Sequence, residues 1–140
     1  MTYYAVLDTN VIVSSMLREG SIPDQVLRLA LDGPIVPLLN EEIVAECKDV
    51  LTRNKFGFPE TKIESMLLDL SKRAVFLDRT QSDEVFPDPD DVVFYEVVMT
   101  GRKTSNAYLV TGNTKHYPAR SFVVTPREML DIVERDNKGF

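Results

Sequence analysis

The sequence predicts an α/β fold in which a central parallel sheet of about five strands is covered by helices on both faces. Short apolar segments without polar alternation indicate strands that are buried on both sides, and helical patterns separate these segments along the chain. The 140 residues are 44% hydrophobic and 27% charged, which is enough to build the core of one domain. We therefore expect a single domain over residues 1–140, with a frayed tail at 136–140.

The elements follow from local patterns. The expected strands cover residues 3–7, 35–38, 74–77, 107–110 and 121–124, each a short run of aliphatic, β-branched or aromatic side chains. The expected helices cover about residues 22–32, 41–53, 60–73, 90–101 and 126–135. Asn40 is a suitable N-cap for the second helix, and Pro126 occupies the first position of the last one.

Composition excludes several classes of protein. The longest stretch without Asp, Glu, Lys or Arg is eleven residues, 104–114, whereas a helix needs about 20 apolar residues to cross a bilayer. No basic and apolar signal segment opens the chain, and a single cysteine, Cys47, excludes a disulfide framework. We expect a soluble cytoplasmic protein with no membrane partner.

Negative charge is concentrated in one segment. Residues 78–91 contain six acidic residues and one basic residue, so they account for −5 of the net charge of −6. A uniformly acidic surface would disfavour nucleic acid as a partner. A local acidic patch instead favours a bound cation, and a solvated acidic loop is the alternative.

Oxygen-bearing side chains follow several predicted strands. Asp8 ends the first strand, Asn113 follows the fourth, and the acidic segment leads through Asp88 and Asp91 into a helix. The carboxyl ends of parallel strands form the edge of the sheet at which α/β proteins bind ligands. Oxygen donors without His or Cys suit Mg²⁺ or Mn²⁺, and such a cation serves phosphodiester hydrolysis. The alternative is that Asp8 caps the helix that follows it, and that Asp90 or Asp91 caps the next one.

The helix after Asn40 adds Glu46 to this set. At about 100° per residue, Glu46 lies nearer to the apolar face than the other three acids of this helix. A carboxylate in that position is costly unless it is paired or bound to a metal. The alternative is an ion pair with a nearby base: Lys48, Arg53 or Lys55.

Four segments together resemble the PIN-domain nucleases. Residues 5–10, Ala-Val-Leu-Asp-Thr-Asn, resemble the opening strand of that family, and residues 46–56 resemble its helix-borne Glu followed by Val-Leu-x-Arg-x-Lys. Residues 88–94 resemble its Asp-Pro-Asp-Asp segment, and residues 109–113 resemble the Val-Thr-Gly-Asp that closes the next strand. The four segments occur in the family's order across about residues 3–125.

The resemblance implies a PIN-like, Rossmann-like α/β/α sandwich and a metal-dependent endoribonuclease. Within the superfamily the similarity is to the toxins of bacterial type II toxin–antitoxin pairs. It implies that Asp8, Glu46 and Asp91 are catalytic and bind Mg²⁺ or Mn²⁺, with Asp88 and Asn113 as further ligands. The implied partners are an RNA substrate and a cognate antitoxin, and a homodimer is left open.

Three further expectations concern residues in and beside these motifs. Asn113 departs from the family, which often has Asp there, and a neutral amide favours one metal ion over two. The expected substrate-binding residues are Thr9, Asn10, Thr111 and Lys115. His116 is expected in a surface loop.

The residues after the first strand exclude other nucleotide-binding folds. Residues 8–13 lack the glycines of a dinucleotide-binding turn or a P-loop, and Asn10 breaks the Asp-x-Asp of haloacid-dehalogenase phosphatases. The remaining alternative is a catalytically weak or inactive PIN-fold binding module that engages an antitoxin or nucleic acid. The acidic net charge and Asn113 favour that alternative.

Overall fold

The computed structural model describes residues 1–137, and a five-stranded parallel sheet forms its centre. The strands run in the order β3-β2-β1-β4-β5, and every neighbouring pair is parallel. Their bounds are β1 (Tyr3–Leu7), β2 (Ile35–Leu39), β3 (Val75–Phe76), β4 (Tyr108–Val110) and β5 (Val123–Val124). The predicted parallel sheet of about five strands is confirmed.

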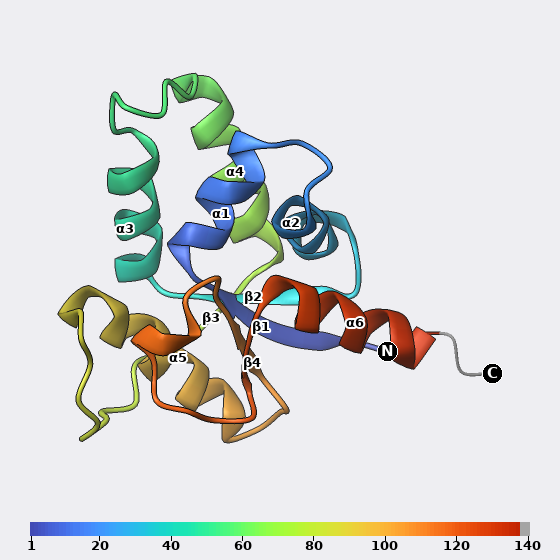
Figure 1. Cartoon of the computed structure of the whole chain (residues 1–140), viewed down its shortest axis with the longest axis vertical. Coiled ribbons are helices and arrows are strands. Elements are labelled where there is room, and N and C mark those ends of the chain that lie inside the picture. The colour runs from blue at the N-terminus through green and yellow to red at the C-terminus, as the bar shows by residue number, and fades with distance from the viewer. Residues whose placement is uncertain (138–140) are drawn as a thin grey trace.

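Helices cover both faces of this sheet, as an α/β/α sandwich requires. The helices α1 to α4 lie on one face and α5 lies on the opposite face, while α6 packs against α2 (Figure 1). Their bounds are α1 (Thr9–Leu17), α2 (Ile22–Asp32), α3 (Glu41–Leu51), α4 (Glu60–Arg73), α5 (Val92–Arg102) and α6 (Pro126–Asn137). Two short 3₁₀ turns, Pro89–Asp91 and Thr114–His116, complete the set.

The strand order places a crevice between β1 and β4. The chain runs outward from β1 through β2 to β3 and then returns, by way of α5, to β4 on the other side of β1. Where the strand order reverses in this way, a crevice opens at the carboxyl ends of the two adjacent strands. Leu7 pairs with Val110, so Asp8 and Thr111 are the first residues beyond the sheet at this point.

The two edge strands are shorter than the sequence predicts. β3 and β5 contain two residues each, whereas the apolar runs predict strands at 74–77 and 121–124. Each of these strands pairs with a single neighbour, and in β3 the side chains of Val75 and Phe76 are 41% and 49% exposed. An apolar run at the edge of a sheet therefore does not guarantee ladder pairing along its length.

The start of α5 also differs from the prediction. The sequence predicts a helix opening at Pro89 or Asp90, but these residues form a 3₁₀ turn and the α-helix begins at Val92. The carboxylate of Asp88 accepts a hydrogen bond from the backbone N–H of Asp90 at 2.9 Å. Asp88, and neither Asp90 nor Asp91, is thus the residue that caps this segment.

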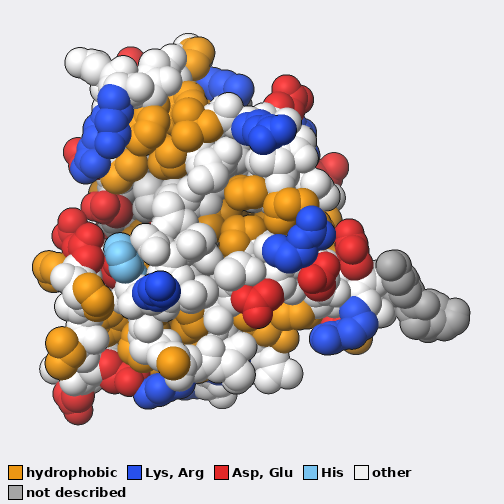
Figure 2. All heavy atoms as spheres, in the orientation of Figure 1, with side chains coloured by type: hydrophobic (Ala, Val, Ile, Leu, Met, Phe, Trp, Pro, Cys, Tyr) orange, Lys and Arg blue, Asp and Glu red, His pale blue; other side chains and the backbone are white. Residues whose placement is uncertain are grey.

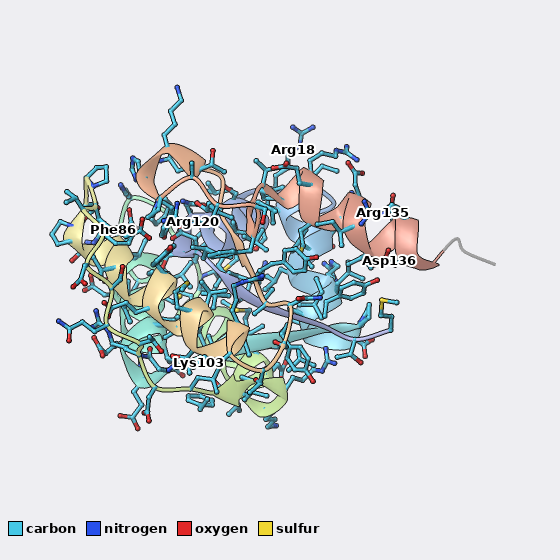
Figure 3. The ribbon with its side chains drawn as sticks, turned by 90° about the horizontal axis from the view of Figure 1, so that it is seen from below. Arg18, Phe86, Lys103, Arg120, Arg135 and Asp136 are labelled. Atoms are coloured by element: carbon cyan, nitrogen blue, oxygen red, sulfur yellow. The ribbon has the colours of Figure 1, made fainter. Side chains whose placement is uncertain are left out.

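The end of α6 overlaps the tail that the sequence predicts to fray, residues 136–140. Asp136 and Asn137 continue α6, and Figure 3 shows Asp136 beside Arg135 on the last turn of that helix. The hydroxyl of Tyr3 donates a hydrogen bond to the Asp136 carboxylate at 2.9 Å, which ties the end of α6 to β1. Residues 138–140 lie outside the described part of the chain.

The core holds the helices close to the sheet. The side chains of Ala5, Val6 and Leu109 are fully buried between the two helical layers. Gly101 lets α5 approach β2, because a Cβ atom there would lie 2.6 Å from Cδ1 of Leu38. Within residues 1–137, no helix combines the length and the apolarity that a membrane crossing requires.

Candidate active site

A hollow of about 380 Å³ lies beyond the carboxyl ends of β1 and β4. We call it the acidic hollow, because five carboxylates from three separate parts of the chain line it: Asp8, Glu46, Asp88, Asp90 and Asp91. Asn113, the neutral oxygen donor among the expected ligands, lines it as well. The structure therefore brings all the expected metal ligands to one concave surface.

Asp8 is held at the floor of the acidic hollow by three side-chain donors. Its Oδ2 accepts hydrogen bonds from Thr111 Oγ1 at 2.8 Å, Asn10 Nδ2 at 3.0 Å and Tyr117 Oη at 3.1 Å. The residue is 4% exposed, and burial raises the pKa of its carboxyl while the hydrogen bonds from Thr111 and Tyr117 lower it. Asp8 stands at the N-cap of α1 but makes no side-chain capping bond, so the capping alternative does not apply.

Glu46 is the least exposed of the four acids on α3, as its helical phase predicts. Burial first, and then the negative charges of Asp90 and Asp49, raise the pKa of its carboxyl. Arg53 makes its ion pair with Asp49, at 3.3 Å. Within residues 1–137 no base lies within ion-pair distance of Glu46, so the alternative of an ion pair with Lys48, Arg53 or Lys55 is wrong here.

Asp91 lines the hollow together with Asp8 and contacts a histidine. Burial, followed by repulsion from Asp8 and Asp88, raises the pKa of Asp91 to about 6. His116 Nδ1 lies 3.2 Å from Oδ2 of Asp91, and its positive form lowers that pKa. A carboxyl group with such a pKa binds a proton readily when no cation is present.

Asp88 and Asn113 stand at the rim with part of their hydrogen-bonding capacity in use. Oδ1 of Asp88 accepts the bond from the Asp90 N–H, which leaves Oδ2 for another partner. The backbone N–H of Asn113 donates to Thr111 Oγ1 at 3.0 Å, while the Asn113 side chain lines the hollow. Both residues are therefore able to present one side-chain oxygen to a ligand.

The four expected substrate-binding residues have different surroundings. Thr111 is fully buried, so its hydroxyl orients Asp8 and is not available to substrate, contrary to the expectation. Asn10 and Thr9 both line the hollow. Thr9 Oγ1 also lies 3.5 Å from Cys47 Sγ, and this contact joins α1 to α3 beside Glu46. Lys115 is exposed and lines a neighbouring hollow with Arg120.

Sequence reasoning missed two residues of this site. His116, expected in a surface loop, lines the acidic hollow against Asp91, and Tyr117, 6% exposed, donates to Asp8. Burial, followed by the negative charge of Asp8, holds the pKa of the Tyr117 hydroxyl far above its ordinary value. The available signal was position, since both residues follow within four residues of Asn113, in the turn that comes after β4.

The donor set fits a hydrated divalent cation rather than a fully enclosed one. Within residues 1–137, no three His, Cys, Asp or Glu side chains lie close enough together to hold a metal ion directly. The carboxylates nonetheless face one hollow, and the pKa values of Asp8, Glu46 and Asp91 are all raised. Mg²⁺ and Mn²⁺ commonly keep several waters and bind through one or two carboxylates, which matches this spacing.

The metal-free protein is expected to lose stability as the pH rises from 3.8 to about 6. Asp91 keeps its proton to about pH 6 in the folded state, whereas its ordinary pKa is 3.8. In that interval the folded state binds more protons than the unfolded state, so the free energy of unfolding falls with rising pH. Millimolar Mn²⁺ is expected to raise the melting temperature above pH 6, because cations bind the ionised carboxylates.

Thermal unfolding between pH 4 and pH 7, with chelator or with Mn²⁺, measures both effects. Mg²⁺ in place of Mn²⁺ tests whether the site accepts either hard cation. A melting temperature that Mn²⁺ leaves unchanged at pH 7 would rule out a cation site in the acidic hollow.

Comparison with known proteins identifies the family. The family model described as PIN domain matches residues 4–115, a range that contains every carboxylate of the acidic hollow. The chain is also similar to the uncharacterized protein MJ1680 of Methanocaldococcus jannaschii, with 29% identity over 93% of this chain and 91% of that protein. No solved structure matches the chain. The chain belongs to the PIN domain family, whose general activity is that of a nuclease.

Proposed function

We propose that this protein is a Mg²⁺- or Mn²⁺-dependent endoribonuclease and the toxin of a type II toxin–antitoxin pair. The observation that carries the proposal is the convergence of Asp8, Glu46 and Asp91 on one hollow from three distant parts of the chain. Their position at the crevice between β1 and β4 is where α/β folds place their active sites. Nuclease chemistry needs this combination of oxygen ligands and an open approach for substrate.

Asp8 and Asp91 are the proposed cation ligands. A bound Mg²⁺ or Mn²⁺ would polarise the phosphodiester and make a water molecule more acidic. Asp8 suits the role because Thr111, Asn10 and Tyr117 fix its Oδ2, so the second oxygen is oriented without further loss of side-chain freedom. Asp91 is oriented in the same way by His116.

Glu46 is the proposed acceptor for a proton from the attacking water. It lines the hollow opposite the strand ends, is half-buried, and has a raised pKa. A carboxylate whose pKa lies above its usual value is a better base than an ordinary surface glutamate. Glu46 also fits as a further cation ligand, and both roles need it ionised.

RNA as substrate, and the role of toxin, rest on the resemblance to toxin components. An antitoxin that carries Lys or Arg on its bound segment would complement the carboxylates of the acidic hollow, and the proposal leaves room for a homodimer. The direct test uses purified protein and an end-labelled single-stranded RNA, incubated with Mg²⁺, with Mn²⁺ or with chelator. Internal products that require metal support the endoribonuclease. Growth arrest on induced expression, relieved by the product of the neighbouring gene, supports the toxin.

A catalytically inactive binding module is the second candidate. Two observations favour this candidate. Within residues 1–137, no three His, Cys, Asp or Glu side chains lie close enough together to hold a metal ion, and Asn113 offers a neutral amide where a carboxylate would bind a cation more strongly. Under this alternative the protein binds RNA or a basic antitoxin segment but yields no products with either metal. Binding without cleavage, in protein free of host nuclease, would therefore replace the first proposal with the second.

Asn113→Asp is expected to strengthen cation binding and to weaken the metal-free fold. An added carboxylate about 4 Å from a divalent cation gains at least about 1 kcal/mol even in water, or about fivefold in affinity, and more in a drier site. Without metal, the new charge repels Asp8 and Asp91, so the melting temperature should fall. Calorimetric Mn²⁺ titration and melting curves with chelator measure the two effects. Equal affinities in the two proteins would place Asn113 outside the cation site.

A further inference from the structure

We propose that Phe56 is a stacking platform for an unpaired nucleobase beside the scissile phosphate, with Arg53 and Lys55 contacting the adjoining phosphates. The inference rests on the proposed nuclease function of the acidic hollow and names the form of substrate that it takes, a single strand. Phe56 lies in the connection between α3 and α4, residues 52–59, which borders the hollow on the side opposite the strand ends.

Phe56 and Arg53 form part of the wall of the acidic hollow. Apolar side chains gather beside the α3–α4 connection, with Lys and Arg side chains next to them and acidic side chains together with the single histidine, His116, below (Figure 2). One rim of the hollow is thus apolar and basic, while the floor is acidic. A nucleotide has matching parts, an apolar base face and an anionic phosphate.

The ring of Phe56 is held in place by a second aromatic ring. Phe56 and Phe58 stack with their ring centres 5.5 Å apart and their planes 9° from parallel. Gly57 between them has a φ of +65°, a backbone conformation that brings the chain round sharply and that residues with a Cβ rarely adopt. Both rings are half-buried, so the platform is fixed before a base arrives and loses little freedom on binding.

A lysine side chain lies over the Phe56 ring. Nζ of Lys55 lies 5.0 Å from the centre of the Phe56 ring, and Lys55 is exposed. An exposed cation–π contact is weaker than stacking of a base on an aromatic ring. A base is therefore able to displace the ammonium group, which then lies within reach of the neighbouring phosphate.

The negative charge of the hollow favours a substrate contact that does not depend on charge. Carboxylates repel a phosphodiester, and among the residues that line the hollow Arg53 is the one Lys or Arg side chain. The ion pair of Arg53 with Asp49 is solvent-exposed on both sides, so it contributes little and leaves the guanidinium available. Proteins that hold single strands combine positive charge along the backbone with aromatic rings on which bases stack, and Arg53 and Phe56 supply one of each at the hollow.

The test compares a short single-stranded RNA with an RNA of equal length that lacks its bases. Binding is measured by fluorescence anisotropy with chelator present, so no cleavage occurs. The intact protein is expected to bind the normal strand about fivefold or more tightly than the abasic strand, as stacking of one base predicts. Phe56→Leu is expected to remove this difference, and Phe56→Trp is expected to retain it.

Phe58→Leu is the matched control, since it removes a half-buried ring of the same pair that does not line the hollow. Because Phe56 remains but loses its stacking partner, Phe58→Leu should keep part of the preference for the normal strand, whereas Phe56→Leu should lose it. The platform would be overturned if the Phe56→Leu protein bound both strands as the intact protein does. It would also be overturned if the variant lost affinity for both strands equally. If the protein cleaves RNA but binds the normal and abasic strands equally, the platform alone is refuted. If it binds the normal strand more tightly but cleaves no RNA with either metal, the nuclease alone is refuted.

Discussion

Asp8→Asn is expected to reduce metal-dependent RNA cleavage about 1,000-fold or more while leaving the fold intact. Losing a single electrostatic contact to the reacting group commonly costs about 100- to 1,000-fold in rate, and Asp8 is also a proposed ligand of the cation itself. Asp8 lies at the floor of the acidic hollow, 4% exposed, and three side-chain donors fix its Oδ2.

The fold should tolerate the change because the amide matches the carboxylate in shape. The amide oxygen of the new side chain can accept the bonds that Thr111, Asn10 and Tyr117 now donate to Oδ2. Burial raises the pKa of Asp8, which means that its negative charge is unfavourable in the metal-free fold. The melting temperature with chelator is therefore expected to stay the same or rise.

Initial cleavage rates over a range of Mn²⁺ concentrations, together with melting curves, measure the effect. Asp69→Asn is the control, because Asp69 is an exposed acid on α4 that does not line the acidic hollow. It should leave both the rate and the metal dependence unchanged. An Asp8→Asn protein that cleaves RNA at more than a tenth of the normal rate would remove Asp8 from the catalytic site.

The strands of the sheet could be predicted because each one is a short apolar run that is visible in the local sequence. The run Tyr3–Leu7 is apolar on both faces and ends at Asp8, and its burial in a parallel sheet follows from that pattern alone. The strands at the sheet edges were less predictable. The pattern at 74–77 is equally apolar, but only Val75 and Phe76 pair, because the length of an edge ladder depends on where the neighbouring strand ends.

The position of Glu46 was predictable for a different reason. Helical periodicity fixes the angle between Glu46 and the buried residues Ile43 and Cys47, and the structure places Glu46 toward the hollow while the other acids of α3 are exposed. Periodicity says nothing about residues in irregular segments. The acidic run at 78–91 illustrates this, since Glu84 pairs with Arg120 while Asp88, Asp90 and Asp91 reach the hollow.

The positions of His116 and Tyr117 in the site could not be predicted from local sequence patterns. Both lie at the short turn after β4, and their neighbours Asp91 and Asp8 are distant in sequence. The path of that turn brings them back over the strand ends, and no periodic pattern encodes such a path. The contact of Phe86 with Tyr117 and Tyr95 has the same origin, and Phe86 lies beside the start of α5 (Figure 3).

Thr111→Val is expected to lower the rate of RNA cleavage about 10- to 100-fold, the range found for residues that orient metal ligands. The hydroxyl of Thr111 donates to Asp8 Oδ2 at 2.8 Å and accepts from the Asn113 N–H at 3.0 Å. Valine has nearly the same shape but cannot make either bond. Leaving buried polar groups unpaired also costs about 1–3 kcal/mol of folding free energy.

A positioning role for Thr111 has two further consequences that a general loss of stability would not produce. The hydrogen bond from Thr111 lowers the pKa of Asp8, so its loss should raise that pKa and move the acidic limb of the pH–rate profile to higher pH. A less well oriented and less ionised Asp8 binds cation more weakly, so half-maximal rate should need more Mn²⁺. Unfolding of part of the sample would reduce the maximal rate without moving either midpoint.

Thr111→Ser separates the hydroxyl from the methyl group of the same side chain. Serine keeps both hydrogen bonds but leaves a small void where the fully buried methyl group packs, so it should lose stability while keeping the Mn²⁺ midpoint and the pH profile. If serine and valine shift the Mn²⁺ midpoint equally, packing and not the hydroxyl governs the site. If only the valine variant shifts the Mn²⁺ midpoint, the hydroxyl of Thr111 is the group that orients Asp8. Both residues lie at the junction of β1 and β4, where the reversal of strand order opens the crevice.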